Sequence, residues 1–374
     1  MIEALFTTPI GLEEVASEDL GDHAVVAAER GRGWVRGMVE DEIHLARVVY
    51  SARGISRGIL LLREAAVESL EDISQVVASI DWRDFIPPNS TFACRSSRMG
   101  EHPFTRMDME RISGASIIAS LPYRPRVNLE SPDVLVRVNL YGDRLFVGVD
   151  FTGPVSMDRR RYRLFNHRAA LNPVIASLMV RIALDKTDGR RILDPFTGGG
   201  TILIEACHRM RSVPAGYFRK GEMGFLRLPF LKHVNWKALF DEWDSSIRWG
   251  ERGCLVGMDI SPVSIGGARL NSRRAEADDC LHLRLADFTR FDCMEGRFDA
   301  IVTNPPYGIR MGSLVKAKKV HRYLFSRGGE YLSEGGVMVV ITPHRSLVKG
   351  WEVGKEWRVV AGGLELSVLL LEPV

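Results

Sequence analysis

The sequence predicts an α/β chain whose first half is an α+β region and whose second half is a doubly wound, mostly parallel sheet. From Arg191 onward, strands alternate with helices, which is typical of parallel sheets built from βα units. A turn with three glycines, Gly198–Gly200, joins the first of these strands to a helix. The first half instead contains short strands separated by turns, with hairpin signals at "RGRG" and "YGD".

Short strands and helices make up the predicted N-terminal region. We expect strands at Ile2–Thr8, His23–Ala28, Trp34–Val39, Gly58–Arg63, Thr91–Arg95, Val134–Leu140 and Leu145–Phe151. We expect helices at Leu12–Leu20, Asp41–Ala52, Ser69–Ile80 and Thr105–Leu121. Ser69 with Asp72, and Thr105 with Asp108, have the spacing of a capping box at a helix start. These elements predict two small units that pack together within residues 1–151.

Residues 152–172 differ from both halves in composition. The segment "TGPVSMDRRRYRLFNHRAALN" offers few core residues and is rich in arginine. We interpret it as a basic linker between the N-terminal region and residues 173–374.

The second half contains the βα units. We expect strands at Arg191–Asp194, Cys254–Asp259, Leu281–Ala286, Phe298–Val302 and Val337–Thr342, and two more within Arg358–Leu371. We expect helices at Thr201–Met210, after the Ser261-Pro262 start signal, and at Val315–Leu332. An insertion at about 211–250 separates the first unit from the second. Its aromatic residues have core-like spacing, so a helical flap over the sheet is favoured over a direct contact with a binding partner.

Composition excludes several classes of protein. The chain has 374 residues, 45% apolar and 26% charged, which is ordinary for a soluble globular protein of two or three domains. Its apolar runs are far shorter than the ~20 residues that span a bilayer, and its start does not resemble a signal peptide. The 5 cysteines are scattered without a CxxC pattern, so we expect no disulfide framework and no metal. We therefore expect a cytoplasmic protein without membrane contact.

Polar groups follow four successive strands of the second half. "DPFTGGGT" (Asp194–Thr201) follows the first, Asp259 the second, Asp287-Phe288 the third and Asn304-Pro305-Pro306-Tyr307 the fourth. Because ligands of open α/β sheets bind at the carboxyl ends of the strands, these groups predict one site. The glycine spacing differs from G-x-G-x-x-G, and the loop lacks a phosphate-loop lysine, so a nicotinamide dinucleotide or ATP is disfavoured. Asp259, after the second strand, suits ribose hydroxyls, and Asp287, after the third, suits an adenine amine. Together they favour a nucleoside without a phosphate chain, such as S-adenosylmethionine.

The stretch "TNPPYG" predicts the chemistry. An exocyclic amine of a base is a weak nucleophile because its lone pair is delocalised into the ring. The Asn304 carboxamide oxygen and the Pro305 carbonyl can accept the two amine protons, and Tyr307 offers a ring for stacking. The prolines hold this corner rigid, so it can position the amine for in-line attack without a strong base.

Together, "DPFTGGGT" and "TNPPYG" resemble class I methyltransferases, with a Rossmann-like domain, that modify amino groups of nucleic-acid bases. The upstream stretches "RSSRMGEHPFTRMDMERISGASI" (Arg95–Ile117) and "DRRRYRLFNHRAALNP" (Asp158–Pro173) are similar to THUMP-domain RNA guanine-N2 methyltransferases. Two branches of this family resemble the sequence: tRNA enzymes that act on an acceptor-stem guanosine, and 23S ribosomal RNA enzymes. The resemblance implies a ferredoxin-like plus THUMP RNA-binding region in residues 1–151.

The resemblance also implies residue roles. Asp194 and Gly198–Gly200 would hold the methionine end of S-adenosyl-L-methionine, Asp259 the ribose and Asp287 the adenine. Catalytic groups would be Asn304, Pro305 and Tyr307. The cofactor site would comprise Asp194, Phe196, Gly198, Gly200, Thr201, Asp259, Ile260, Asp287, Phe288, and, from the linker, His167 and Leu171. The RNA-binding residues would be Arg95, Arg98, Arg106, Arg159, Arg160, Arg161 and Arg163.

The predicted function is methyl transfer to guanosine N2, with the tRNA acceptor stem (m2G at position 6) ahead of 23S ribosomal RNA. An adenine-N6 methyltransferase and a non-catalytic RNA-binding protein are the alternatives. We expect a monomer with RNA, most readily tRNA, as partner. The sequence does not indicate a small activating subunit.

Overall fold

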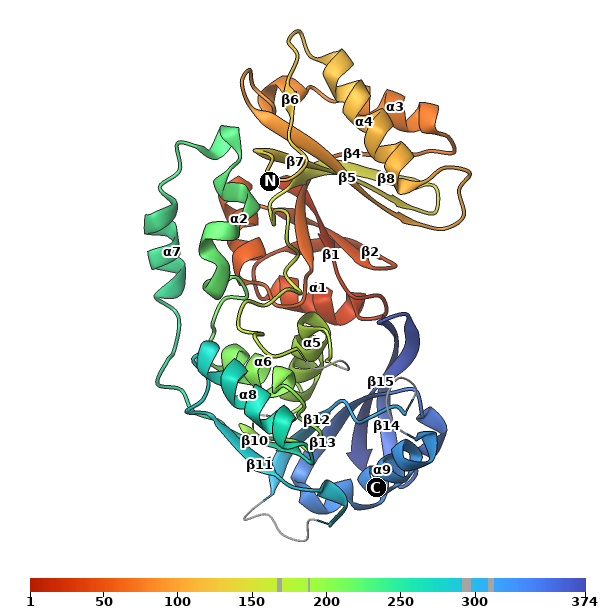
Figure 1. Ribbon diagram of the computed structural model, residues 1–374, viewed down its shortest axis with the longest axis vertical. Helices are drawn as coiled ribbons and strands as arrows, with labels where there is room; N and C mark the ends of the chain where they lie inside the picture. Colours follow the sequence, from red (N-terminus) through yellow and green to blue (C-terminus); the bar gives the residue numbers. More distant parts are fainter. Residues whose placement is uncertain (167–169, 188, 291–296, 309–312) are drawn as a thin grey trace.

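Two lobes, each built around one sheet, form this computed structural model (Figure 1). The structure describes residues 1–166, 170–187, 189–290, 297–308 and 313–374. The N-terminal lobe carries β1 to β8 and lies at the top of Figure 1, and the C-terminal lobe carries the second sheet below it. No helix in these ranges combines the length and apolar character needed to cross a membrane.

One continuous sheet supports the N-terminal lobe. In the described residues it has eight strands in the order β2-β3-β1-β4-β8-β7-β5-β6. They are β1 (Ile2–Thr7), β2 (Val26–Gly31), β3 (Trp34–Val39), β4 (Arg57–Ala66), β5 (Thr91–Met99), β6 (Arg126–Val127), β7 (Val134–Tyr141) and β8 (Arg144–Asp150). The helices are α1 (Glu13–Gly21), α2 (Glu42–Ser51), α3 (Leu70–Ala78) and α4 (Arg106–Ser120), with the 3-10 turn η1 (Trp82–Asp84). Because β4 pairs with β8, the two expected units share this sheet.

Both predicted capping boxes are present at helix starts. The Ser69 hydroxyl accepts from the Asp72 amide at 3.2 Å, and the Asp72 carboxylate accepts from the Ser69 amide at 2.9 Å. Thr105 and Asp108 make the same pair of hydrogen bonds at α4. These bonds satisfy amides that a helix start otherwise leaves without a partner.

A second sheet supports the C-terminal lobe. Its seven described strands have the order β11-β10-β9-β12-β13-β15-β14. They are β9 (Arg191–Asp194), β10 (Cys254–Asp259), β11 (Leu281–Leu285), β12 (Phe298–Thr303), β13 (Leu332–Thr342), β14 (Trp351–Ala361) and β15 (Leu364–Pro373). The five strands β9 to β13 are parallel, and β15 lies antiparallel between β13 and β14, so β14 runs in the same direction as the first five. This confirms the doubly wound, mostly parallel sheet.

Helices cover both faces of the second sheet. They are α5 (Pro173–Leu184), α6 (Thr201–Met210), α8 (Pro262–Arg274) and α9 (Leu314–Arg327), whereas α7 (Trp236–Asp244) lies in the insertion and packs on the N-terminal lobe. The 3-10 turns are η2 (Tyr217–Glu222), η3 (Gly224–Leu226), η4 (Pro229–Leu231), η5 (Phe288–Arg290), η6 (Gly328–Tyr331) and η7 (Arg345–Leu347). Residues of α5 and α6 form a core with one face, and Leu324 and Phe325 of α9 form a core with the other. The helix expected to reach Leu332 ends at Arg327, where two glycines follow and favour a tighter turn.

The sequence prediction missed α5. This helix begins after Asn172, whose side chain accepts from the Val174 amide at 2.8 Å, with Pro173 in the first helical position. Most of its residues are buried, so it lacks the polar face by which a surface helix is recognised. Asn172 as the N-cap and Pro173 in the first helical position could have predicted the start of this helix from the sequence.

The two lobes are joined by segments that are far apart in the sequence. Leu12, Val15 and Ala16, at or next to α1, belong to the core of the C-terminal lobe. Figure 1 shows α1 next to α5, and the two helices are in contact. Gly11, with φ +93°, approaches β14 so closely that an added Cβ would lie 1.8 Å from the Arg358 carbonyl oxygen. Only glycine fits there.

The insertion does not form a flap over the C-terminal sheet, and that expectation is wrong. Phe225, Phe240 and Trp243 lie in the core of the N-terminal lobe. Tyr50 of α2 packs against Phe240 and Trp243 at ring distances of 4.9 and 5.7 Å. Figure 1 shows α7 running beside the N-terminal lobe. The apolar spacing indicated burial correctly, but it could not indicate which lobe provides the partner surface. The domain boundaries at 151 and 172 stay a prediction.

Candidate active site

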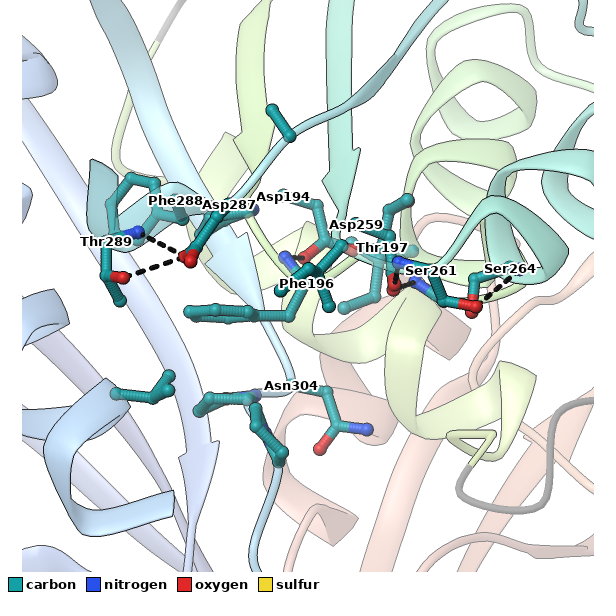
Figure 2. Close-up of a pocket in the computed structure, with 18 of the residues that line it drawn as sticks. Asp194, Phe196, Thr197, Asp259, Ser261, Ser264, Asp287, Phe288, Thr289 and Asn304 are labelled. Atoms are coloured by element: carbon teal, nitrogen blue, oxygen red, sulfur yellow. Dashed lines mark hydrogen bonds between the residues drawn. The ribbon is translucent and has the colours of Figure 1, made fainter. Parts of the chain in front are cut away.

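A cavity of about 690 Å³ opens at the carboxyl ends of the parallel strands. Residues after β9, β10, β11 and β12 line it, as the sequence predicts. In Figure 2, the three aspartates lie on one side of the cavity, Asn304 on the other, and Phe196 between them. Of the predicted site residues, those on its lining are Asp194, Phe196, Gly198, Thr201, Asp259, Ile260, Asp287, Phe288, Asn304, Pro305, Tyr307 and Leu171.

The glycine-rich turn shapes one wall of the cavity. Gly198 has φ +50°, and an added Cβ there would meet nothing within 4 Å, so the backbone borders open space. The Gly198 amide donates to Asp259 at 3.0 Å, which ties the turn to the end of β10. Gly200 adopts a left-handed conformation and caps α6, but it is not on the cavity lining. Its role is to turn the chain into the helix.

Asp194 is buried at the end of β9. Its carboxylate accepts from the Thr303 hydroxyl at 2.7 Å and from the Phe196 amide at 3.2 Å. Burial outweighs the hydrogen bonds from Thr303 and Phe196 and, with a smaller contribution from the nearby charge of Asp259, raises the pKa of Asp194 to about 7. A cation in the cavity would favour its ionised form.

Asp259 and Asp287 are held by their own loops and keep acceptor capacity. Asp259 accepts from the amides of Gly198 and Ser261, at 3.0 and 2.8 Å. Asp287 accepts from the amide and hydroxyl of Thr289, at 2.9 and 2.8 Å. Each carboxylate offers about four acceptor positions, so both can still bind a hydroxyl or an amine. The Phe288 ring is buried and meets Phe196 edge-on at 5.7 Å.

The Asn304–Tyr307 corner forms the opposite wall. The Tyr307 hydroxyl donates to the Asn304 carboxamide oxygen at 2.5 Å. Burial raises the pKa of the Tyr307 phenol, so it remains a donor at neutral pH. Behind the corner, a ring nitrogen of His344 lies 3.2 Å from the Tyr307 carbonyl oxygen. The carboxamide is partly exposed on the lining, which is where the chemical argument requires it.

Several cavity residues were missed by the sequence prediction. They are mainly polar or basic: Thr197, Ser261, Ser264, Thr289, Arg290, Lys316 and Lys319. Lys316 and Lys319 are one turn apart on the helix that follows the Asn-Pro-Pro-Tyr corner, which was a usable signal. His167, expected beside the cofactor, lies outside the described residues.

The predicted RNA-binding arginines divide by exposure. Arg106, Arg159 and Arg161 are exposed, whereas Arg95, Arg98 and Arg163 are half-buried. Arg95 bonds to the Cys94 and Leu129 carbonyls, and Arg161 pairs with Glu222.

Arg160 corrects the prediction. Its side chain is 2% exposed and donates from Nε to Glu205 at 3.1 Å. A guanidinium enclosed in this way cannot reach an RNA backbone. The arginine run therefore contains exposed residues, which can reach RNA, and the buried Arg160, which pairs with Glu205 inside the protein.

A parallel sheet with one antiparallel strand, β15, next to its edge, a glycine-rich turn and an Asn-Pro-Pro-Tyr corner define a class I methyltransferase domain. The protein-family model described as "RMKL-like, methyltransferase domain" matches residues 160–361, and the THUMP domain model matches residues 67–150. The chain therefore belongs to the RMKL-like methyltransferases that carry a THUMP domain. In the described residues, no group of three or more possible metal-ligating side chains gathers.

Similar proteins agree with this assignment. A tRNA (guanine(6)-N2)-methyltransferase of Methanocaldococcus jannaschii is 33% identical, over 96% of this chain and 97% of its own. The ribosomal RNA large subunit methyltransferase K/L of Pseudoalteromonas translucida is 27% identical, over 85% of this chain but 45% of its own. A solved structure of a possible methylase from Clostridium difficile 630 has a TM-score of 0.87 at 20% identity, covering 100% of this chain and 98% of its own, which shows the shared fold.

Proposed function

We propose that this protein transfers a methyl group from S-adenosyl-L-methionine to the exocyclic N2 of a guanosine in tRNA, at position 6 of the acceptor stem. The observation that carries the proposal is the shared cavity: Asn304 and Pro305 line the same space as Asp194, Asp259 and Asp287. The likeness to the tRNA enzyme extends over nearly the full length of both chains, whereas the chain matches less than half of the ribosomal RNA enzyme.

The cavity fits the cofactor in shape and charge. Open space at Gly198 lets a ligand approach the backbone, and the aspartates favour a cationic nucleoside. The cations on the described lining, Arg290, Lys316 and Lys319, come from η5 and α9 and not from the glycine-rich turn. That turn therefore suits a ligand without a phosphate chain.

The protein's contribution is binding and orientation. Bound S-adenosyl-L-methionine supplies the electrophilic methyl group. The Asn304 carboxamide oxygen and the Pro305 carbonyl accept the two N–H groups of the guanine amine, which increases electron density on nitrogen and directs its lone pair. Thr303 and the two prolines hold this corner at the end of β12, so little reorganisation accompanies the reaction.

Methylation assays on altered tRNA transcripts test this function. Transcripts with guanosine, inosine or adenosine at position 6 are incubated with labelled cofactor and digested for nucleoside mass spectrometry. We expect N2-methylguanosine from the first and no product from inosine, which lacks the amine. Methylation of the adenosine transcript instead would favour the adenine-N6 alternative. Asn304→Ala is the matched control and should lose transfer while still binding the cofactor by calorimetry.

A further inference from the structure

Helix α9 presents cations to the same cavity that holds the Asn304–Tyr307 corner. Lys316 and Lys319 lie one turn apart, are exposed and line this cavity. Within the described ranges, neither makes an ion pair. The α9 sequence, "LVKAKKVHRYLFSR", contains no acidic residue, so nothing on the helix neutralises them. They are therefore available for an external anion.

The position of α9 relative to the catalytic corner is fixed by packing. Gly308, directly after Tyr307, has φ +74° and lies so close to the first turn of α9 that an added Cβ would be 2.9 Å from the Leu314 Cα. The buried His321 ring bonds to the Ala317 carbonyl and to the Thr342 hydroxyl of β13, each at 2.9 Å. The lysines are thus mounted on a rigid element beside the site of methyl transfer.

Charge separates the two ends of the cavity. Asp194 and Asp259, which bonds to the Gly198 amide, make the end at the glycine-rich turn unfavourable for a phosphate. Lys316 and Lys319 make the α9 end favourable, and Arg290 adds a third cation that is partly offset by Asp287 at 3.7 Å. The α9 end is therefore the part of the cavity whose charge is more favourable for a phosphate.

We propose that Lys316 and Lys319 bind the phosphates next to the target nucleotide and hold the backbone while its base lies against Asn304. This inference rests on the proposed function, because it takes RNA as the substrate. A base in a stem must leave its stack to be methylated, which costs a few kcal/mol. Phosphate contacts close to the flipped nucleotide can offset that cost and fix the position of its backbone.

The test compares Lys316→Ala, Lys319→Ala and the double variant with Lys318→Ala. Lys318 is on the same helix but does not line the cavity, so it is the matched control. We expect each cavity lysine to slow single-turnover methylation of tRNA about tenfold, as for a lost charged hydrogen bond. Lys318→Ala should stay close to the parent protein, and the affinity for S-adenosyl-L-methionine should be unchanged in every variant.

A synthetic tRNA with neutral methylphosphonates on both sides of the target nucleotide identifies the contacted group. It should be methylated more slowly than normal tRNA by the parent protein, and at the same rate as normal tRNA by the double variant. If the cavity lysines behave like Lys318, or if methylphosphonates slow the double variant as much as the parent, the inference is wrong.

A binding measurement separates this inference from the proposed function. Each lost phosphate contact should reduce the slope of log affinity against log salt by about 0.7–0.9, whether or not methyl transfer occurs. If the parent protein binds tRNA but methylates none, the proposed function fails while a smaller slope for the double variant still supports the phosphate contacts. If methylation is intact and neither rate nor slope changes, only the inference fails.

Discussion

At the scale of single residues, the hydrogen bond between Tyr307 and Asn304 gives the tyrosine a role that the sequence did not indicate. The sequence predicts a stacking ring, but the phenol also occupies one lone pair of the carboxamide oxygen. That oxygen has a second lone pair for the substrate amine. We therefore interpret Tyr307 as a positioning residue that fixes which way the Asn304 amide faces.

Tyr307→Phe separates the two roles. The ring remains for stacking, but the hydrogen bond at 2.5 Å is lost. We expect single-turnover methylation to fall about tenfold, in line with one hydrogen bond, with cofactor affinity unchanged. Tyr307→Ala should lose more because it also removes the ring. A phenylalanine variant as fast as the parent protein would rule out the positioning role.

Asp194 makes cofactor binding pH-dependent. Its pKa of about 7 is raised from 3.8 by burial, so the free carboxyl holds a proton below pH 7. Because this pKa is higher in the folded protein than in the unfolded chain, the group favours the folded, cofactor-free protein at low pH. That contribution to the free energy of unfolding is lost as the pH rises through 7. A cationic ligand favours the ionised form. We expect binding of S-adenosyl-L-methionine at pH 6 to release a proton, seen by calorimetry as an enthalpy that depends on the buffer. In Asp194→Asn the dependence should disappear, and its persistence would assign the proton to another group.

At the scale of elements, apolar spacing predicts that a segment is buried but not where. The insertion illustrates this, since its aromatic residues suggested a cover for the C-terminal sheet and lie instead in the N-terminal core. The Tyr50 hydroxyl donates to Asp244 at 2.7 Å, which adds a polar contact to this packing. We infer that the insertion, which starts and ends in the C-terminal lobe and packs on the N-terminal lobe, acts as a brace that holds the two lobes together.

Trp243→Ala tests the brace. The side chain is 5% exposed, so its removal should lower the free energy of unfolding by about 3–5 kcal/mol. Hydrogen exchange should accelerate in α2 and β4, with β9 and β10 less affected. Lys237→Ala, on the exposed face of the same helix, should change stability by less than about 0.5 kcal/mol. Faster exchange confined to the C-terminal sheet would contradict this view of the insertion.

At the scale of the whole molecule, one buried carboxylate connects three parts of the chain. Glu205 of α6 accepts from Arg53, which precedes β4, and from Arg160 and Tyr162 of the linker, at 2.5 to 3.1 Å. Burial by itself would raise the pKa of Glu205, but Arg160 and Arg53 outweigh this and lower it below 4.5. Since α6 begins at the glycine-rich turn, this hydrogen-bond network connects the N-terminal lobe to the helix that borders the cofactor end of the cavity.

Glu205→Gln should weaken the attachment of the lobes. It leaves two buried guanidinium groups without a counter-ion, which costs about 3–5 kcal/mol. Because the pKa of Glu205 is lowered, the contribution is present above pH 4.5 and is lost as the solution is acidified below it. Chemical unfolding should show the loss, and small-angle scattering should show altered lobe positions. Arg161→Ala, at a surface pair, should cost less than about 1 kcal/mol. Equal stability of Glu205→Gln and the parent would refute a joining role.

The sequence by itself determined the parallel sheet, the helix caps and the order of the site groups along the chain. It could do so because these features depend on local spacing: the residue that follows a strand reaches the same sheet edge wherever the rest of the chain lies. Tertiary structure alone decided which lobe receives the insertion, that Arg160 is buried while Arg161 is exposed, and that Lys316 and Lys319 line the same cavity as Asn304. These outcomes depend on contacts between segments distant in sequence, and neither apolar spacing nor charge specifies the partner surface.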